Sequence, residues 1–233
     1  MANAAGQVGM PSLEVVRAAL AIVHSKLKTY YPDEGLFARS KYPKHLKFFR
    51  ATTEFNEVCF MAGNRVGKTC AGGFASAVWL TGRYPKWWEG RRFDGPIKMW
   101  ACGDTGHTVK NILQEQLLGS PVSPGSGFIP PADVYYTTPK IGIPEAVGTA
   151  YVRHQSGGIS ECTFKSYDQR RESFQGTAID LIWDDEEPPL DIYDEQMMRL
   201  VTTGGLMILT MTPLQGLTSL VSQYMAESPV ASI

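Results

Sequence analysis

The sequence of 233 residues lacks the patterns that mark several classes of protein. No apolar run approaches the roughly 18 residues of a membrane-spanning helix, and no basic and then apolar leader opens the chain. The four cysteines lie far apart without a Cys-x-x-Cys pair, and three of them fall in predicted buried strands. This pattern favours reduced, packed thiols over a disulfide framework. We therefore expect a soluble intracellular protein without a membrane contact.

A large excess of one charge is absent too. The chain has 22 Lys and Arg against 23 Asp and Glu, so any DNA contact has to come from local patches. No Ser-, Gly- or Pro-rich linker divides the sequence, and 43% hydrophobic residues suffice for one large core. We predict a single domain, with an N-terminal helical segment over residues 1–40 and a core over residues 41–233.

A glycine-bearing stretch organises the chain. Its predicted nucleotide-binding residues are Ala62, Gly63, Asn64, Arg65, Val66, Gly67, Lys68 and Thr69. An apolar strand precedes this stretch and an Ala-rich helix follows it, which is the context that a phosphate-binding loop requires. Gly63 and Gly67 permit a tight backbone path, so that amide hydrogens point at phosphate oxygens beside the positive end of the helix. The alternative is a surface glycine loop that happens to contain Gly-Lys-Thr.

Two side chains of this loop have predicted roles in binding ATP and Mg²⁺. Lys68 reaches the β- and γ-phosphates, and the Thr69 hydroxyl completes the metal shell. The motif G-x-x-x-x-G-K-[ST] puts its first glycine where this chain has Ala62. We treat the loop as a variant, because alanine is the smallest substitution and Gly63 beside it can absorb part of the turn.

Apolar strands alternate with helices along the chain. Strands are predicted over residues 58–61, 97–102, 159–164, 178–183 and 206–210, and helices over residues 12–23, 70–80, 108–118, 191–200 and 218–225. Asp191 is the predicted N-cap of one helix, and the Pro- and Gly-rich stretch 119–148 should carry little regular structure. This alternation indicates an α/β fold, with a mainly parallel central sheet flanked by helices. Ligands of such sheets lie beyond the carboxyl ends of the strands.

An acidic cluster, residues 184–187, follows the predicted strand 178–183. Hydrolysis needs an acid that holds the metal and a group that orients water. We assign Asp185 to Mg²⁺ and Glu186 to the attacking water as general base. The alternative register, Asp184 with Asp185, leaves no glutamate in the base position. A solvated acidic run before the next helix is the other interpretation.

Three further side chains belong to the predicted site. Thr210 and Thr212 lie at the end of the last strand, where a hydroxyl can bond the attacking water or the γ-phosphate. Arg65 is close enough to touch the γ-phosphate in cis, and such an arginine contributes about 10³ to 10⁵ in rate. Alternatively, Arg65 is a structural tether and a neighbouring subunit supplies the arginine. The possible donors are Arg91, Arg92, Arg153, Arg170 and Arg171.

A basic stripe precedes the loop, with a cation at every third position. It consists of Lys41, Lys44, Lys47 and Arg50. Aromatic residues lie between these cations, so the stripe can contact a nucleic acid backbone. An ordinary solvated helix face over packed Phe48 and Phe49 is the alternative.

Three motifs in this order resemble the ATPase domain of the large terminase subunit of tailed bacteriophages. They are Gly63 to Thr69, Ile182 to Pro189 and Thr210 to Pro213; Tyr42 to Phe49 and Ser166 to Gly176 are also similar, so the likeness covers residues 40–220. The resemblance implies a P-loop NTPase of the additional-strand ATPase type. It also implies an ATPase motor domain that hydrolyses ATP with Mg²⁺ to drive double-stranded DNA into a procapsid.

The resemblance also implies roles for single residues. The family usually has an apolar residue where Asp184 stands, so Asp185 and Glu186 are the matched acids. The segment Thr210 to Pro213 is the coupling motif between hydrolysis and DNA movement. His45 lies near the adenine as a base contact, at a place where relatives often have glutamine.

Partners and location follow from the same resemblance. The implied partners are double-stranded DNA, a portal protein ring and a small terminase subunit, with a pentamer during translocation and a monomer in isolation. The location is the host cell cytoplasm. Large terminases normally carry a carboxyl-terminal RNase H-like nuclease, for which this chain has no room, so we expect a piece of a longer protein without nuclease activity.

Two other functions stay open. The chain could be another additional-strand ATPase that acts on nucleic acid, such as a helicase or recombinase module. It could also be a nucleotide-dependent binding switch without turnover. A GTPase is disfavoured, because no Asn-Lys-x-Asp guanine signature is present.

Overall fold

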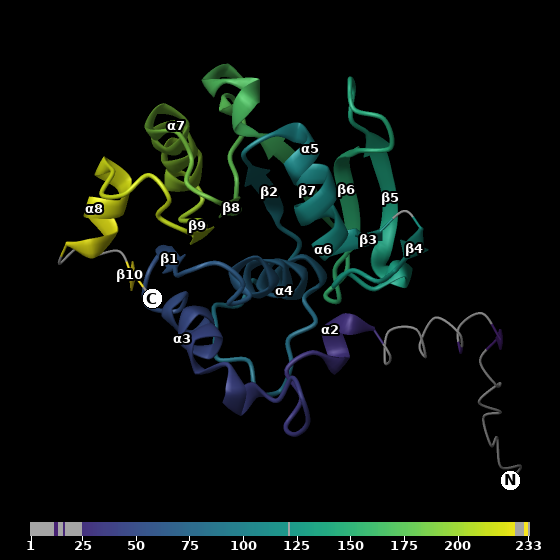
Figure 1. The fold of residues 1–233 in the computed structure, drawn as a ribbon. Helices are drawn as coiled ribbons and strands as arrows, with labels where there is room; N and C mark the ends of the chain where they lie inside the picture. The colour runs from purple at the N-terminus through teal and green to yellow at the C-terminus, as the bar shows by residue number, and fades with distance from the viewer. Residues whose placement is uncertain (1–11, 14–15, 17–24, 121, 227–230, 233) are drawn as a thin grey trace, which may run out of the picture.

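The computed structural model describes residues 12–13, 16, 25–120, 122–226 and 231–232 (Figure 1). Its described strands form one eight-stranded sheet in the order β10-β1-β9-β8-β2-β7-β6-β5, beside a small hairpin of β3 and β4. The strands are β1 (Glu57–Met61), β2 (Lys98–Gly103), β3 (Gly119–Ser120), β4 (Ser123–Pro124), β5 (Val134–Pro139), β6 (Val147–Arg153), β7 (Ile159–Ser166), β8 (Leu181–Asp185), β9 (Leu206–Met211) and β10 (Ala231–Ser232). Pairing is parallel from β10 to β7 and antiparallel from β7 to β5, so the predicted mainly parallel α/β sheet is confirmed.

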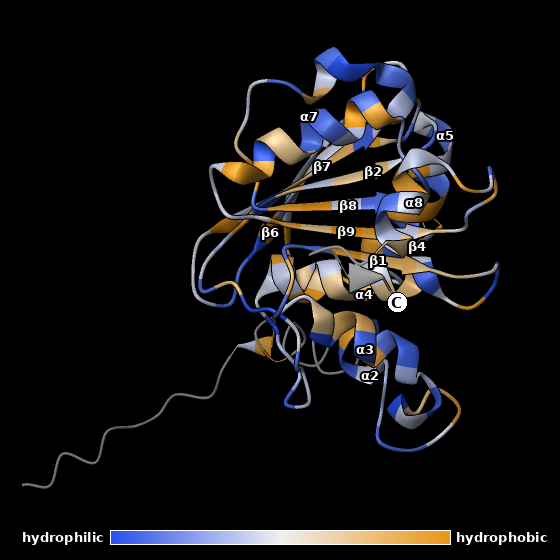
Figure 2. Ribbon diagram, turned by 90° about the vertical axis from the view of Figure 1, so that its left-hand side faces the viewer, coloured by the Kyte–Doolittle hydropathy of each residue, from blue (hydrophilic) through white to orange (hydrophobic). Residues whose placement is uncertain are grey.

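Helices cover both faces of this sheet. The helices are α2 (Lys26–Thr29), α3 (Pro43–Ala51), α4 (Lys68–Thr81), α5 (Gly106–Thr108), α6 (Glu115–Leu118), α7 (Leu190–Val201) and α8 (Ser219–Met225). Figure 2 shows α3 and α4 on one face and α7 on the other. Each face has its own buried apolar cluster, because the strands alternate their side chains between the two sides. Within the described residues, no helix is both long and apolar enough to cross a membrane.

Helix α4 begins at Lys68, in the predicted phosphate loop, and is buried along almost its whole length. Small residues let it approach the sheet closely. A Cβ atom at Gly72 would lie 2.5 Å from the indole nitrogen of Trp183, so only glycine fits against this ring. The helix is therefore seated directly on β8, the strand in which the acidic cluster begins.

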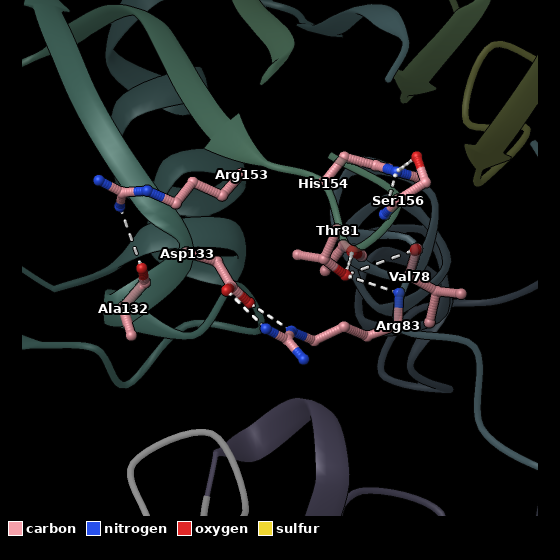
Figure 3. Close-up of polar contacts among 9 residues, drawn as sticks. Val78, Thr81, Arg83, Ala132, Asp133, Arg153, His154 and Ser156 are labelled. Carbon is pink, nitrogen blue, oxygen red and sulfur yellow. Dashed lines mark hydrogen bonds and ion pairs between the residues drawn. The ribbon is translucent and has the colours of Figure 1, made fainter. Parts of the chain in front are cut away.

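The far end of α4 is fixed by polar contacts (Figure 3). Gly82 ends the helix at φ 65°, and the His154 ring covers it. Arg83 then donates to both carboxylate oxygens of the buried Asp133, at 2.6 and 2.8 Å. Arg153 donates to the carbonyl oxygen of Ala132 nearby. The Arg83–Asp133 pair ties the end of the helix to the segment before β5, and loss of the arginine would leave the buried Asp133 carboxylate without its partner.

Two predictions about local structure were wrong. The stretch 119–148 contains β3, β4, β5 and the start of β6. Its prolines and glycines mark turns, while the strand Val134–Pro139 is rich in β-branched and aromatic residues that favour extended backbone. Asp191 is not the N-cap of α7: Pro189 has that place, and Asp191 lies in the first turn. There its charge still favours the positive end of the helix.

Other boundaries moved by a few residues. The predicted strand 178–183 is β8 at Leu181–Asp185, so two of the acids lie inside the strand. The predicted helix 108–118 begins at Gly106 and contains a π-helical segment, Val109–Gln114. The predicted helix over residues 12–23 lies almost wholly outside the described residues.

The remaining predictions about packing agree with the structure. Strands β1, β2, β7 and β9 and helix α8 lie where the sequence places them. Cys59, Cys102 and Cys162 are free and buried in strands, as expected for reduced thiols. Leu27 and Tyr31, which belong to the predicted N-terminal segment, are part of the core under α4.

Candidate functional site

The predicted phosphate-binding loop lies between β1 and α4 and makes a tight turn there. Gly67 is the N-cap of α4 with φ 84°, and Arg65 also has a left-handed φ of 64°. A Cβ atom at Gly67 would lie 3.0 Å from the His45 ring, so glycine is needed there for space as well. Ala62 and Gly63 have no positive φ. This explains why alanine can stand at the first position of the motif, and the turn does not rely on Gly63.

Lys68 is the charged centre of the loop. Its ammonium donates to the Gly63 carbonyl oxygen and to the Thr212 hydroxyl, both at 2.8 Å. The Thr212 hydroxyl in turn donates to Asn64 at 2.9 Å. Burial lowers the pKa of Lys68, while the charges of Glu186 and Asp185 raise it. The structure thus brings the loop lysine, the third motif and both predicted acids together.

Asp185 is bound from two sides by hydroxyl groups. Thr69, at the start of α4, donates to its carboxylate at 2.9 Å. Thr210 on the adjacent strand β9 donates at 2.6 Å, and its own oxygen accepts the Trp183 indole N–H at 2.8 Å. Burial raises the pKa of Asp185 to about 6, against the lowering effect of both hydroxyls. Thr210 is fully buried beneath Asp185, so of the two predicted coupling threonines it is Thr212 that faces the loop.

Glu186 directly follows β8 and has an unusual backbone. Its φ is 78°, a left-handed conformation that costs a non-glycine residue about 1–3 kcal/mol. Its N–H donates to the Thr210 carbonyl at 3.0 Å, and its carboxylate accepts the Thr212 amide at 3.2 Å. Because Thr212 also contacts Lys68, the Glu186 carboxylate lies on the phosphate-loop side of the sheet edge.

These donors fit a nucleotide triphosphate with Mg²⁺. Among the described residues, no group of three or more His, Cys, Asp or Glu side chains could hold a metal. Mg²⁺ in such sites takes one or two carboxylates, with phosphate and water oxygens filling the other positions. The adjacent Thr69 hydroxyl and Asp185 carboxylate match that donor set. The loop amides, the N-terminus of the 14-residue α4 and Lys68 supply positive charge for phosphates.

His45 lies on α3, next to a cavity of about 500 Å³ that Tyr42, Phe60 and the phosphate loop also line. Its Nε2 lies 2.9 Å from the Val66 carbonyl oxygen, and its Nδ1 lies 2.6 Å from the Tyr31 hydroxyl. Since a carbonyl only accepts, Nε2 carries the hydrogen and Nδ1 accepts from the tyrosine. Burial lowers the pKa of His45, in keeping with this neutral form. Both ring nitrogens are used within the protein, so the ring rather than a nitrogen is presented to the cavity, and contact with adenine stays a prediction.

The predicted arginines fall into two groups. Arg65 is exposed on the loop, and within the described residues its guanidinium has no hydrogen bond or ion pair. Arg170 and Arg171 follow β7 at the same sheet edge, and Arg171 is paired with Glu195. Arg91 lies at the opposite edge of the sheet. Its guanidinium donates to Asn56, just before β1, and to the carbonyl oxygen of Gly204, just before β9. Arg153, at the end of the antiparallel β6, lies at that opposite edge too.

The basic stripe before the loop is exposed, and two of its members border the cavity. The four side chains Lys41, Lys44, Lys47 and Arg50 all face solvent. Lys41 and Lys44 line the cavity beside the phosphate loop. Contact of the stripe with a nucleic acid backbone stays a prediction.

Sequence reasoning assigned no role to Asp184 or to the two side chains that bond it. Asp184 is fully buried, and burial raises its pKa to about 7. Tyr167 and Gln196 both donate to its Oδ1, at 3.1 and 2.8 Å. The position of Asp184 inside an otherwise apolar strand was the signal in the sequence. Its partners could not be inferred, because they come from separate elements of the chain.

Comparison with known proteins gives a consistent result. The family model for the terminase large subunit, T4likevirus-type, N-terminal part, matches residues 59–232. The large terminase subunit of Salmonella phage P22 is 37% identical over 218 residues, covering 85% of this chain. The chain spans only 44% of the length of that relative. No solved structure gives a significant match.

Proposed function

The chain belongs to the family of phage terminase large subunits, and from this we propose that it is the ATPase motor part of a DNA-packaging terminase. In this role it hydrolyses ATP to ADP and phosphate and drives double-stranded DNA into a procapsid. The observation that carries the proposal is the meeting of three motifs at one sheet edge. Lys68 contacts Thr212, Thr212 contacts Glu186, and Thr69 contacts Asp185.

Each side chain then has a distinct task. Lys68 and the loop amides bind and orient the phosphates, and Thr69 with Asp185 would hold Mg²⁺, which neutralises phosphate charge when bound. Glu186 accepts a proton from the attacking water at its carboxylate. Thr212, between Lys68 and Glu186, is placed to respond to the γ-phosphate. Arg65 is the candidate for stabilising the transition state in cis, with Arg170 and Arg171 of a neighbouring copy as alternative donors.

The strand order supports the additional-strand class of P-loop NTPase. Strand β9 lies between β1, which leads into the phosphate loop, and β8, which carries the acids. The third motif therefore follows a strand that separates the other two. Thr210 pairs in register with Asp185 on one side and with Phe60 on the other. A change in conformation at the phosphate loop can therefore be transmitted to Asp185 and Glu186 through the single strand β9.

The partners belong to the proposal as well. We propose that the intact protein acts on double-stranded DNA in the host cell cytoplasm, with a portal protein and a small terminase subunit. A pentamer is the proposed translocating form, and a monomer is the proposed form of this chain in isolation. The family resemblance supports these partners, and the exposed basic stripe on and just before α3 offers one surface for DNA.

Substitution of Glu186 tests the proposed chemistry. We expect Glu186→Ala to lower ATP turnover at least about 100-fold, the size of a general-base contribution, while nucleotide binding survives. ATP hydrolysis is measured with and without DNA over a range of protein concentrations, and binding with a fluorescent ATP analogue. The matched control is Glu187→Gln, because Glu187 bonds Thr218 and not the loop. Near-normal turnover in Glu186→Ala would contradict the base assignment.

The same assays separate the alternatives. Packaging with procapsids supports the terminase motor, whereas strand separation without procapsids favours a helicase-like module. Very slow turnover that protein concentration does not raise favours a nucleotide-dependent switch. Turnover that rises with concentration indicates an arginine supplied by a neighbouring copy.

A further inference from the structure

A buried polar cluster lies beneath Glu186, and we name its three members, Tyr167, Asp184 and Gln196, the support cluster. Tyr167 belongs to the turn after β7, Asp184 to β8 and Gln196 to α7. Gln196 donates to the Asp184 carboxylate at 2.8 Å, and Tyr167 donates to the same oxygen at 3.1 Å. The cluster therefore joins three elements that are separate in the sequence.

The tyrosine hydroxyl also reaches the backbone of the proposed general base. It lies 3.1 Å from the Glu186 carbonyl oxygen, the same distance as from Asp184, so its single hydrogen is shared between the two acceptors. On the other side of that residue, the Glu186 N–H donates to β9 at 3.0 Å. The residue in its strained left-handed conformation is thus held at both ends. Strain of this kind persists only where surrounding contacts fix it.

Burial of the Asp184 carboxylate in the support cluster lowers the stability of the fold, which points to a role beyond packing. Asp184 has no exposed surface, and its second oxygen has no partner among the described residues. A well-packed apolar side chain is usually at least as stable at such a place in a sheet. Asp184 has such a role if its carboxylate fixes the position of the Tyr167 hydroxyl. Without that bond the hydroxyl could move and lose its contact with the Glu186 carbonyl oxygen.

We propose that Tyr167 and Asp184 are positioning residues that hold the Glu186 backbone, and with it the carboxylate, in the geometry for activating water. This inference rests on the proposed ATPase function. Among the described residues, no hydrogen bond joins the support cluster to Lys68, Thr69 or the phosphate loop, so we expect it to act on turnover and not on nucleotide binding. Gln196, on α7, donates to the same oxygen of Asp184 and helps to orient its carboxylate.

The test compares two Tyr→Phe substitutions, each of which removes a hydroxyl that is bound to a carboxylate. Tyr167→Phe should lower kcat about three- to tenfold, the effect of one hydrogen bond, with KM unchanged within twofold. The matched control is Tyr193→Phe, because the Tyr193 hydroxyl bonds the buried Glu57. Asp184→Asn keeps the accepting oxygen and should retain kcat, whereas Asp184→Leu should lose it like Tyr167→Phe. Equal effects of Tyr167→Phe and Tyr193→Phe, or an unchanged kcat in Tyr167→Phe, would overturn the proposal.

A second measurement does not depend on turnover. Hydrogen exchange of the peptide over residues 185–190 should be about three- to tenfold faster in Tyr167→Phe than in the wild type, and unchanged in Tyr193→Phe. Unchanged exchange in Tyr167→Phe would overturn the proposal even if the chain hydrolysed no ATP. Absent turnover in the wild type, with faster exchange in Tyr167→Phe, would refute the ATPase function and support the positioning contact.

Discussion

The Thr210 hydroxyl joins two side chains, Trp183 and Asp185, at the centre of the site, and its removal is the sharpest test of the geometry. It accepts the Trp183 indole N–H at 2.8 Å and donates to Asp185 at 2.6 Å, with no exposed surface. The substitution Thr210→Val keeps the shape of the side chain and deletes only the hydroxyl. It leaves the indole N–H without a partner and Asp185 with the Thr69 hydroxyl alone.

The size of the effect follows from these two losses. A buried donor left without a partner costs about 1–3 kcal/mol, and a hydrogen bond to a charged group contributes about 1.5–3 kcal/mol. We therefore expect Thr210→Val to lower the free energy of unfolding by at least about 2.5 kcal/mol. The control Thr210→Ser keeps the hydroxyl and loses one methyl group, which costs only about 1 kcal/mol.

The assay is urea unfolding of both variants, with the free energy taken by linear extrapolation. A double-mutant cycle adds Trp183→Phe, which has no indole N–H. In that background Thr210→Val should cost less, by about 1–3 kcal/mol, because no donor is left unpaired. If the valine and serine variants are equally stable, or if the cycle is additive, the hydroxyl does not bridge these groups as the structure has it.

Two further predictions concern the phosphate loop and the His45 ring that bonds it. Gly67→Ala should destabilise the chain by about 1–2 kcal/mol, because alanine is strained at φ 84°. Its matched control, Gly63→Ala, has no atom within 4 Å of the added carbon and should leave urea unfolding nearly unchanged. The pKa of His45 is lowered from 6.5 in the folded state, so the unfolded chain binds more protons and stability is lost as pH falls below about 6.5. The stability of the wild type relative to His45→Gln should therefore decrease between pH 8 and pH 5, and a constant difference would contradict a buried neutral His45.

The sequence alone determined the local parts of the site. The apolar strand, the glycine turn and the small-residue helix around Gly67 and Lys68 all lie between Glu57 and Thr81, where backbone preferences act directly. The apolar run before Asp185 and Glu186 likewise predicts a buried strand that ends in acids. Parallel strands present their carboxyl ends at one edge, so the meeting of these segments could be expected before their contacts were known.

The antiparallel part of the sheet was not predictable in the same way. Strand β5 alternates weakly and is largely exposed, so its pattern does not differ from that of a loop. It is extended because β6 pairs with it and β7 pairs with β6. Pairing across chain segments, rather than local preference, decides such a strand.

Tertiary structure alone decided which atom each site residue contacts. Thr210 and Thr212 are two residues apart with the same side chain, yet one is buried against Asp185 and the other bonds Lys68. Asp184 and Asp185 are neighbours in one strand, yet their side chains face opposite sides of the sheet and different partners. Strand parity allows this difference, but only the register of β8 against β9 and the position of α7 fix the partners. Those contacts join positions far apart in the chain, so their chemistry exists only once the sheet has formed.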